Sequence, residues 1–308
     1  MKNLILPALL LISVSTFAQK FKLALNLQKD STYYLNSSSS LTIIQDITGQ
    51  KQTIEMIMGG RIAHKVTAIK DSVYDMEVKY ASLSVSMKVG AMHVNMNSAG
   101  GGGNSLLDKL MASVINVPFY MSITRTGKVL SVTGMEKLYE NMTANVPEAT
   151  DAQKAQFKTQ MAQSFGEKSL KGAFQDAFAM FPVKKVGLND TWTASTVLES
   201  SGMAAKVNTT YALNAVTNDA YVIHGDATVG AVSANPGYRS ANGMEMRFID
   251  IKGKSTTDLK LDKNTCWLIE VKITKTIDGI ADIKDSPKIP GGIKFPMSII
   301  GDITTSGK

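Results

Sequence analysis

The sequence predicts an α+β protein that is mainly β: one strongly curved, half-barrel-like antiparallel sheet with about three helices packed on one face. Apolar residues alternate with polar ones before residue 133 and after residue 182, which is the period of half-buried strands. Between them, 134–181 is rich in Ala, Gln, Lys and Glu and has helical periodicity. Tight turns join most of the strands, and strands joined in this way must pair antiparallel.

The N-terminal strands occupy 19–133. Phe21, Leu23, Leu25 and Leu27 recur at every second position and predict a first strand. In the long strand expected over 73–89, the apolar parity switches, which predicts a bulge near Ala81-Ser82. A hairpin is expected around Arg125–Lys128, where Gly127 supplies the positive φ of the turn.

A short helix is expected near 105–116, directly after the glycine tract Gly100, Gly101, Gly102 and Gly103. It interrupts a run of strands, as a mobile lid would, so we interpret the glycines as its hinge. Plain core packing is the commoner role of such a stripe. On the lid interpretation, the ligand-lining residues are its helically spaced apolar side chains, Leu106, Leu107, Leu110, Met111 and Val114.

The middle segment predicts three helices. The first begins at Met135 and ends before Pro147, and the third begins near Glu167 and ends before Pro182. The second starts at Thr150, whose spacing to Gln153 is that of a capping box. From 182 to 308 the chain returns to alternating strands: Thr191–Leu198, Ala204–Val216, Ala220–Val232, Met244–Leu261, Trp267–Ile277 and Lys294–Thr304.

Residues 1–18 have the three parts of a secretory signal peptide: Lys2, the apolar stretch Leu4–Val14, and small residues at Thr16 and Ala18. We expect cleavage after Ala18 and a single β-rich domain over 19–308. The apolar stretch is shorter than the roughly 20 residues of a transmembrane helix. No cysteine follows it to carry a lipid. The prediction is therefore an exported, soluble protein without a transmembrane anchor, periplasmic or extracellular, whose oligomeric state the sequence leaves open.

Charge and the lone cysteine exclude some functions. The formal net charge is +7, but the positive residues are dispersed and lack interleaved aromatics, which argues against nucleic-acid binding. Cys266 lies in an apolar stretch that we interpret as a strand, and we expect a buried, inert thiol there. An intermolecular disulfide or a catalytic nucleophile is the alternative for Cys266, although no activating base lies nearby in the sequence.

Catalytic, metal and cofactor motifs are not recognisable. There is no nucleophile elbow and no phosphate-binding loop. The histidines lack ligand spacing. Alternating methionines such as Met56 and Met58 would suit copper(I), but such patterns are more often core. We therefore assign no catalytic, metal-binding or cofactor-binding residues, while a carboxylate pair that meets only in space stays open.

Several fixed points resemble an uncharacterised family of exported Bacteroidota proteins of about 300 residues, a domain of unknown function. They are the export-signal end Phe17-Ala18-Gln19, the segment from Phe181 to Trp192, and the hairpins at Arg125–Val132 and Leu261–Ile269. The resemblance implies location and fold more than chemistry. More distantly, the architecture is similar to lipoprotein carriers, in which a curved sheet holds helices over an apolar cavity; fold analogy alone does not determine function.

The functional expectation is a non-enzymatic envelope protein that binds a hydrophobic or amphipathic, lipid-like ligand. The 17 methionines favour it, because the flexible thioether side chain adapts to irregular apolar partners. One alternative is a protein-interaction or scaffold module that holds another envelope protein. An enzyme without a recognisable motif comes third.

Overall fold

The computed structural model describes residues 19–99, 106–144, 150–200, 203–241, 244–287 and 289–307. Within these ranges, the side chains of 106–107, 156–157, 160–161, 163–165, 168–169, 176, 198–200 and 241 are not described. The predicted signal peptide over 1–18 lies outside the described residues, so its cleavage stays a prediction. No helix in the described part of the chain combines the length and the hydropathy needed to cross a bilayer.

The described residues form one sheet of 13 strands with four helices, and the mainly β, α+β fold class is confirmed. In the first half, the elements are β1 Thr32–Ile47, β2 Gln50–Lys70, β3 Val73–Val89, β4 Met92–Asn97, α1 Leu106–Ala112, β5 Phe119–Thr124 and β6 Val129–Thr133. The helical segment contains α2 Glu136–Ala144, α3 Asp151–Phe165 and α4 Glu167–Phe178. The second half contains β7 Thr191–Ser200, β8 Met203–Val216, β9 Ala220–Ala231, β10 Arg239–Ala241, β11 Met244–Asp262, β12 Leu268–Ile283 and β13 Ile293–Gly307.

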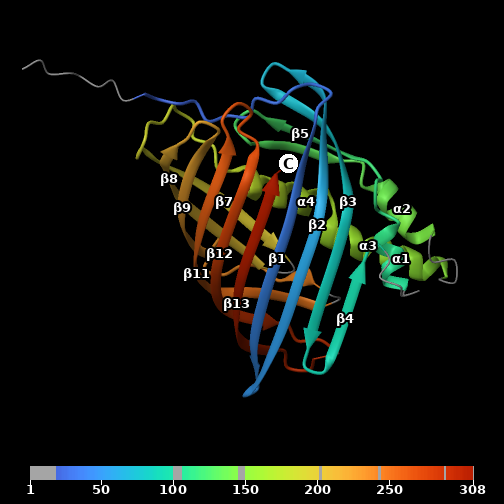
Figure 1. Ribbon diagram of the computed structural model, residues 1–308. Coiled ribbons are helices and arrows are strands. Elements are labelled where there is room, and N and C mark those ends of the chain that lie inside the picture. The colour runs from blue at the N-terminus through green and yellow to red at the C-terminus, as the bar shows by residue number, and fades with distance from the viewer. Residues whose placement is uncertain are drawn as a thin grey trace, which may run out of the picture.

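The sheet is antiparallel and curved (Figure 1), in the order β6-β5-β3-β2-β1-β13-β12-β11-β9-β8-β7. The short strand β4 pairs with β3, and β10 pairs with β11. Most neighbours are consecutive in sequence, but β1 pairs with β13 over Leu35–Gln45. This pairing joins the N-terminal and C-terminal groups of strands into one sheet.

The bulge predicted in β3 is present. Ser82 pairs with Arg61, and Tyr80 pairs with Ile62, so Ala81 has no partner on β2. An extra residue reverses which side chains face the interior. The bulge therefore lets Tyr80 and Leu83 both pack against the core.

Helix α4 crosses the concave face and contacts β6 and β7, the two ends of the strand order (Figure 1). The Gln175 side chain holds it to the β5–β6 hairpin: its Oε1 accepts a hydrogen bond from Val129 N at 2.8 Å, and its Nε2 donates to Gly127 O at 3.3 Å. Helix α1 instead contacts β4, beside the β3–β4 edge. The predicted capping box is confirmed at Thr150 and Gln153.

The predicted strand at Phe21–Leu27 is wrong, although its alternating burial is right. Leu23 and Leu25 are buried, but only Phe21 makes a β-bridge, to Val186. The backbone beyond it bonds to several different elements, with Leu25 N donating to Arg125 O and Asn26 N to Thr265 O. The segment is a buried strap, because its partners are turns rather than one neighbouring strand. Tyr74 holds it through a hydrogen bond from its hydroxyl to Leu25 O, at 2.9 Å.

Cys266 is buried as expected, but it does not lie in a strand. Its φ of 52° places it in the turn before β12, where the chain reverses from β11. Burial raises the pKa of the thiol, which keeps it protonated and unreactive.

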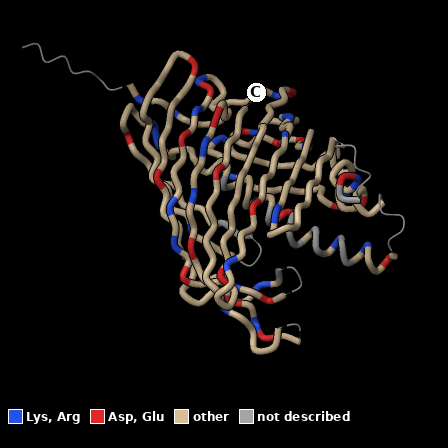
Figure 2. Tube along the Cα trace, turned by 60° about the horizontal axis from the view of Figure 1, so that its bottom comes forward, with Lys and Arg blue, Asp and Glu red and all other residues tan. Residues whose placement is uncertain are grey.

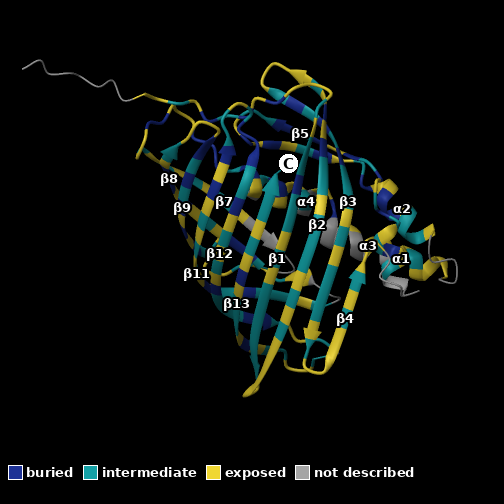
Figure 3. Ribbon diagram, viewed as in Figure 1, coloured by how far each residue is buried: buried dark blue, intermediate teal, exposed yellow. Residues whose placement is uncertain are grey.

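Buried positions gather at the end of the sheet where β5 and α4 lie (Figure 3). This is the larger of two apolar clusters, and the strap and α4 contribute to it. The smaller cluster lies further along the concave face and includes Phe248, Ile277 and Phe295. Charges of both signs are interspersed along the strands (Figure 2), in agreement with the predicted dispersal.

Candidate functional site: a cavity beneath helix α4

A cavity of about 390 Å³ lies between α4 and the concave face of the sheet. Residues of α4 and its C-terminal extension form its roof: Leu170, Ala173, Phe174, Ala177, Phe178 and Met180. Residues from eight strands form its floor: Leu35, Ser37, Ile62, Tyr80, Val207, Thr209, Tyr211, Ala227, Val229, Ser255, Thr257, Leu259, Leu268, Val271, Ile273, Lys275, Ile277, Ile303 and Thr305.

Small side chains on the two surfaces leave the space. On α4, Phe174 and Phe178 are buried, whereas Ala173 and Ala177 are exposed and line the cavity. Residues at i, i+3 and i+4 share a helix face, so the alanines sit beside the phenylalanines that anchor the helix. Across from them, Ala227 and Ser255 are paired neighbours on β9 and β11. The volume falls within the range of ligand pockets in proteins.

Hydroxyl groups are spread over the otherwise apolar floor. Ser37 Oγ and Thr305 Oγ1 share a hydrogen bond of 2.9 Å across β1 and β13. Ser255 and Thr257 contribute two more hydroxyls. Burial raises the pKa of Tyr80 to about 12, so its phenol stays neutral and can donate a hydrogen bond.

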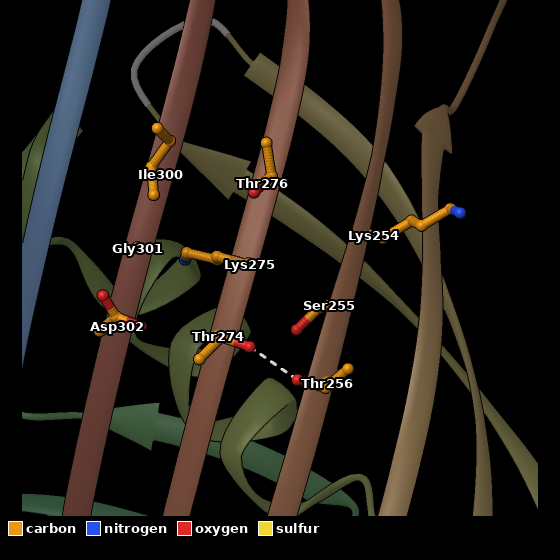
Figure 4. A pocket seen from close by; sticks show the side chains of 9 residues that line it. All are labelled: Lys254, Ser255, Thr256, Thr274, Lys275, Thr276, Ile300, Gly301 and Asp302. Atoms are coloured by element: carbon orange, nitrogen blue, oxygen red, sulfur yellow. Dashed lines mark hydrogen bonds between the residues drawn. The ribbon is translucent and has the colours of Figure 1, made fainter.

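Lys275 is the one charged residue among the described residues that line the cavity. It lies on β12 between Ile273 and Ile277, with Ser255 opposite on β11 and Gly301 opposite on β13. Figure 4 shows its side chain extending from β12 toward Gly301. A Cβ at position 301 would lie 3.0 Å from Lys275 Cε, so glycine leaves the room that the lysine stem occupies.

The same three strands carry a shallow depression on the convex face (Figure 4). Thr256 and Thr274 face it and hydrogen-bond to each other at 2.6 Å between their hydroxyls. It is open to solvent and mixes charged and polar residues without a converging group. We assign no function to it.

The apolar surface continues beyond the part that α4 covers. Val207, Val229 and Ile277 belong both to the cavity lining and to the second apolar cluster. On the neighbouring strands, Met56 and Met297 are half-buried and share the inward face with the cavity-lining positions. A chain longer than the cavity would therefore meet apolar side chains along the concave face.

The helix predicted as a lid does not provide the lining. Leu110 and Val114 are buried and Met111 is half-buried, but none of the three borders the cavity. The side chains of Leu106 and Leu107, and the hinge glycines Gly100–Gly103, lie outside the described residues. The role of these residues in ligand exchange stays a prediction.

The sequence prediction missed two features of the cavity, although each leaves a signal in the sequence. The stripe of α4 pointed to an apolar face but not to an opposing cavity. Lys275 occupies an inward position in the alternation of Val271, Ile273 and Ile277. A lysine in such a row is unusual, because lysine is among the residue types found least often in inward positions.

The three histidines lie in separate environments. His64 is fully buried in the core, and His93 contacts Ser86 Oγ on the surface. His224 lies between Asp258, 2.7 Å from Nδ1, and Asp226, 3.4 Å from Nε2. The hydrogen bond that Asp258 Oδ1 accepts from His224 Nδ1 is the main cause that raises the pKa of His224. No group of three or more His, Cys, Asp or Glu side chains in the described ranges is placed to hold a metal ion.

Two solved structures share only a weak likeness with the chain. The outer membrane protein OprG from Pseudomonas aeruginosa is 10% identical, with a TM-score of 0.23, over 91% of this chain and 97% of that one. The COG4313 outer membrane channel from Pseudomonas putida F1 is 6% identical, with a TM-score of 0.26, over 92% and 97%. Scores this low carry no argument about fold or function.

No curated protein matches the chain. A family model does match, over residues 71–268, which is more than half of the sequence. The matched region begins in the turn before β3 and runs through the helical segment to the start of β12, so it contains α4 and most of the cavity floor. The chain belongs to the family of unknown function DUF6263.

Proposed function

We propose that this protein binds a hydrophobic or amphipathic, lipid-like ligand in the cavity beneath α4, as an exported, non-enzymatic protein of the cell envelope. The observation that carries the proposal is the cavity itself: an apolar space of about 390 Å³ between a helix and a concave sheet. Export rests on the signal-peptide pattern of residues 1–18.

The energetics favour an apolar chain. Removing one methylene from water is worth about 0.8 kcal/mol, so several buried methylenes exceed the cost of ordering the ligand. The roof and floor supply aromatic and aliphatic contacts, and the scattered hydroxyls suit the few polar atoms of an amphipathic molecule. Lipid-like ligands need little polar recognition, because burial alone supplies most of the affinity.

Filling the cavity tests the proposal. Ala177 lines the roof, so Ala177→Trp should occupy the space and reduce binding at least about tenfold. The control is Ala152→Trp, which adds the same side chain at an exposed position of α3. Binding is measured as the fluorescence of N-phenylnaphthylamine, a neutral apolar probe, on the protein comprising residues 19–308.

Native mass spectrometry of the same protein, purified from an envelope fraction, gives an independent measure. Co-purified lipid that is present in the wild type and in Ala152→Trp but missing from Ala177→Trp supports the proposal. A protein that is free of lipid, does not bind the probe and captures one envelope protein instead would identify a scaffold module.

A further inference from the structure

We propose that the ligand is a single-chain anionic amphiphile whose head group is bound by Lys275; this rests on the proposed function of the cavity. Lys275 is the charged member of the described cavity lining, and that lining contains no Asp or Glu. A neutral head group could accept only an ordinary hydrogen bond from the ammonium group. A carboxylate or phosphate ester would gain a charge-assisted hydrogen bond.

The position of Lys275 suits a head group with a chain attached. Its side chain extends from β12 toward Gly301 on β13, on the side away from Ser255 (Figure 4). Lys275 also has an interaction within the protein, so the anion adds to or exchanges with that contact. From this point the apolar floor extends in both directions, toward Ile273 under α4 and toward Ile277 and the second cluster.

Gly301 supports the assignment because it shapes the path of the lysine. Its lack of a side chain leaves room for the Lys275 stem, which extends from β12 toward β13 (Figure 4). A long cationic side chain commonly lays its methylene stem along a surface and presents its charged end to polar groups. The neighbouring Lys254 points away on the opposite face of the sheet.

The experiment compares four ligands with the same chain. Dodecanoate, dodecyl phosphate, dodecanol and dodecyltrimethylammonium each displace N-phenylnaphthylamine from the wild type and from single-site variants. Dodecanoate and dodecyl phosphate should bind the wild type at least about tenfold tighter than dodecanol. Inorganic phosphate, which lacks a chain, should not displace the probe.

Lys275→Met and Lys275→Gln should abolish the preference for anions, so that dodecanoate and dodecyl phosphate bind no tighter than dodecanol. Lys275→Arg should keep the preference, and Lys254→Met, the control on the opposite face, should behave as the wild type. Thermal unfolding establishes that each variant is folded. Methionine and glutamine differ in polarity, so an effect that came from altered packing alone would change ligand binding differently in the two variants.

The ligands and variants together distinguish three results. Preference for only one of the two anions identifies the head group as a carboxylate or a phosphate. If the wild type binds dodecanol as tightly as dodecanoate, or if Lys275→Met keeps the preference, the head-group assignment is overturned while ligand binding stands. If no ligand displaces the probe and native mass spectrometry finds no lipid, the proposed function itself fails.

Discussion

His64 is an ionisable residue whose side chain is completely buried. Neither ring nitrogen has a hydrogen-bond partner within the described residues. Phe174 of α4 and Trp267 pack edge-on against the ring, at 5.9 and 5.3 Å between centroids. Burial is the largest cause that lowers the pKa of His64, from 6.5 to about 4, with backbone groups of Tyr33 and Ile62 opposing it.

This depressed pKa predicts a loss of stability in mild acid. The folded protein holds His64 neutral, whereas the unfolded chain accepts a proton near pH 6.5. The contribution of neutral His64 to the free energy of unfolding is therefore fully present above pH 6.5. It is lost as the pH falls toward 4, by up to about 3 kcal/mol. His64→Leu should remove this part of the pH dependence and, because it removes two unsatisfied polar atoms, should be at least as stable at pH 7.5.

Urea unfolding between pH 7.5 and 4.5 measures the effect. The control is His93→Leu, which changes an exposed histidine on β4 and should keep the slope of the wild type. If the stabilities of His64→Leu and the wild type run parallel across this range, His64 does not remain neutral in the folded state.

At the scale of elements, α4 is held by the β5–β6 hairpin, and Gly127 is where the two meet. Gly127 has a φ of +79°, and a Cβ there would overlap the carbonyl oxygen of Phe178. Gly127→Ala should therefore cost about 2 kcal/mol or more of unfolding free energy and loosen the roof of the cavity. Gly172 lies in α4, and a Cβ there would have no neighbour within 4 Å. Gly172→Ala should therefore stabilise the folded protein by about 0.5–1 kcal/mol.

Thermal unfolding and hydrogen exchange of the α4 amides test this pair. We expect faster exchange in α4 for Gly127→Ala and slower exchange for Gly172→Ala. Equal stability of the two variants would show that the hairpin turn does not support the helix.

At the scale of the whole molecule, the pairing of β1 with β13 makes the two halves of the chain dependent on each other. Trp192 lies on the edge strand β7, and Trp267 lies just before β12 near the middle of the strand order. Because one sheet and one main core contain both, we expect a single cooperative transition. Single-tryptophan variants, Trp192→Phe and Trp267→Phe, should unfold at urea midpoints that coincide with those from circular dichroism. Both tryptophans lie in the second half, whereas circular dichroism reports on the strands of both halves, so a fluorescence midpoint separated from the circular-dichroism midpoint would show that the halves unfold independently.

Much of the architecture was predictable, because periodicity and turn chemistry are local. The bulge at Ala81 followed from a switch in apolar parity, and the start of α3 followed from the capping box at Thr150. The strap over 21–27 was misread, because alternating burial does not specify which groups bond to the backbone. The lining of the cavity was also missed, because the sequence does not say which helix lies over the concave face.

The sequence by itself determined the antiparallel strands, the helical middle and the burial of Cys266, since each depends on neighbours within a few residues. Only the tertiary structure decided that α4, rather than the helix after the glycine tract, roofs the concave face. It also decided that Lys275 lies beneath that roof. The physical reason is that β1 meets β13 from the far end of the chain, and the resulting curvature brings Ala177 and Lys275 to the same cavity.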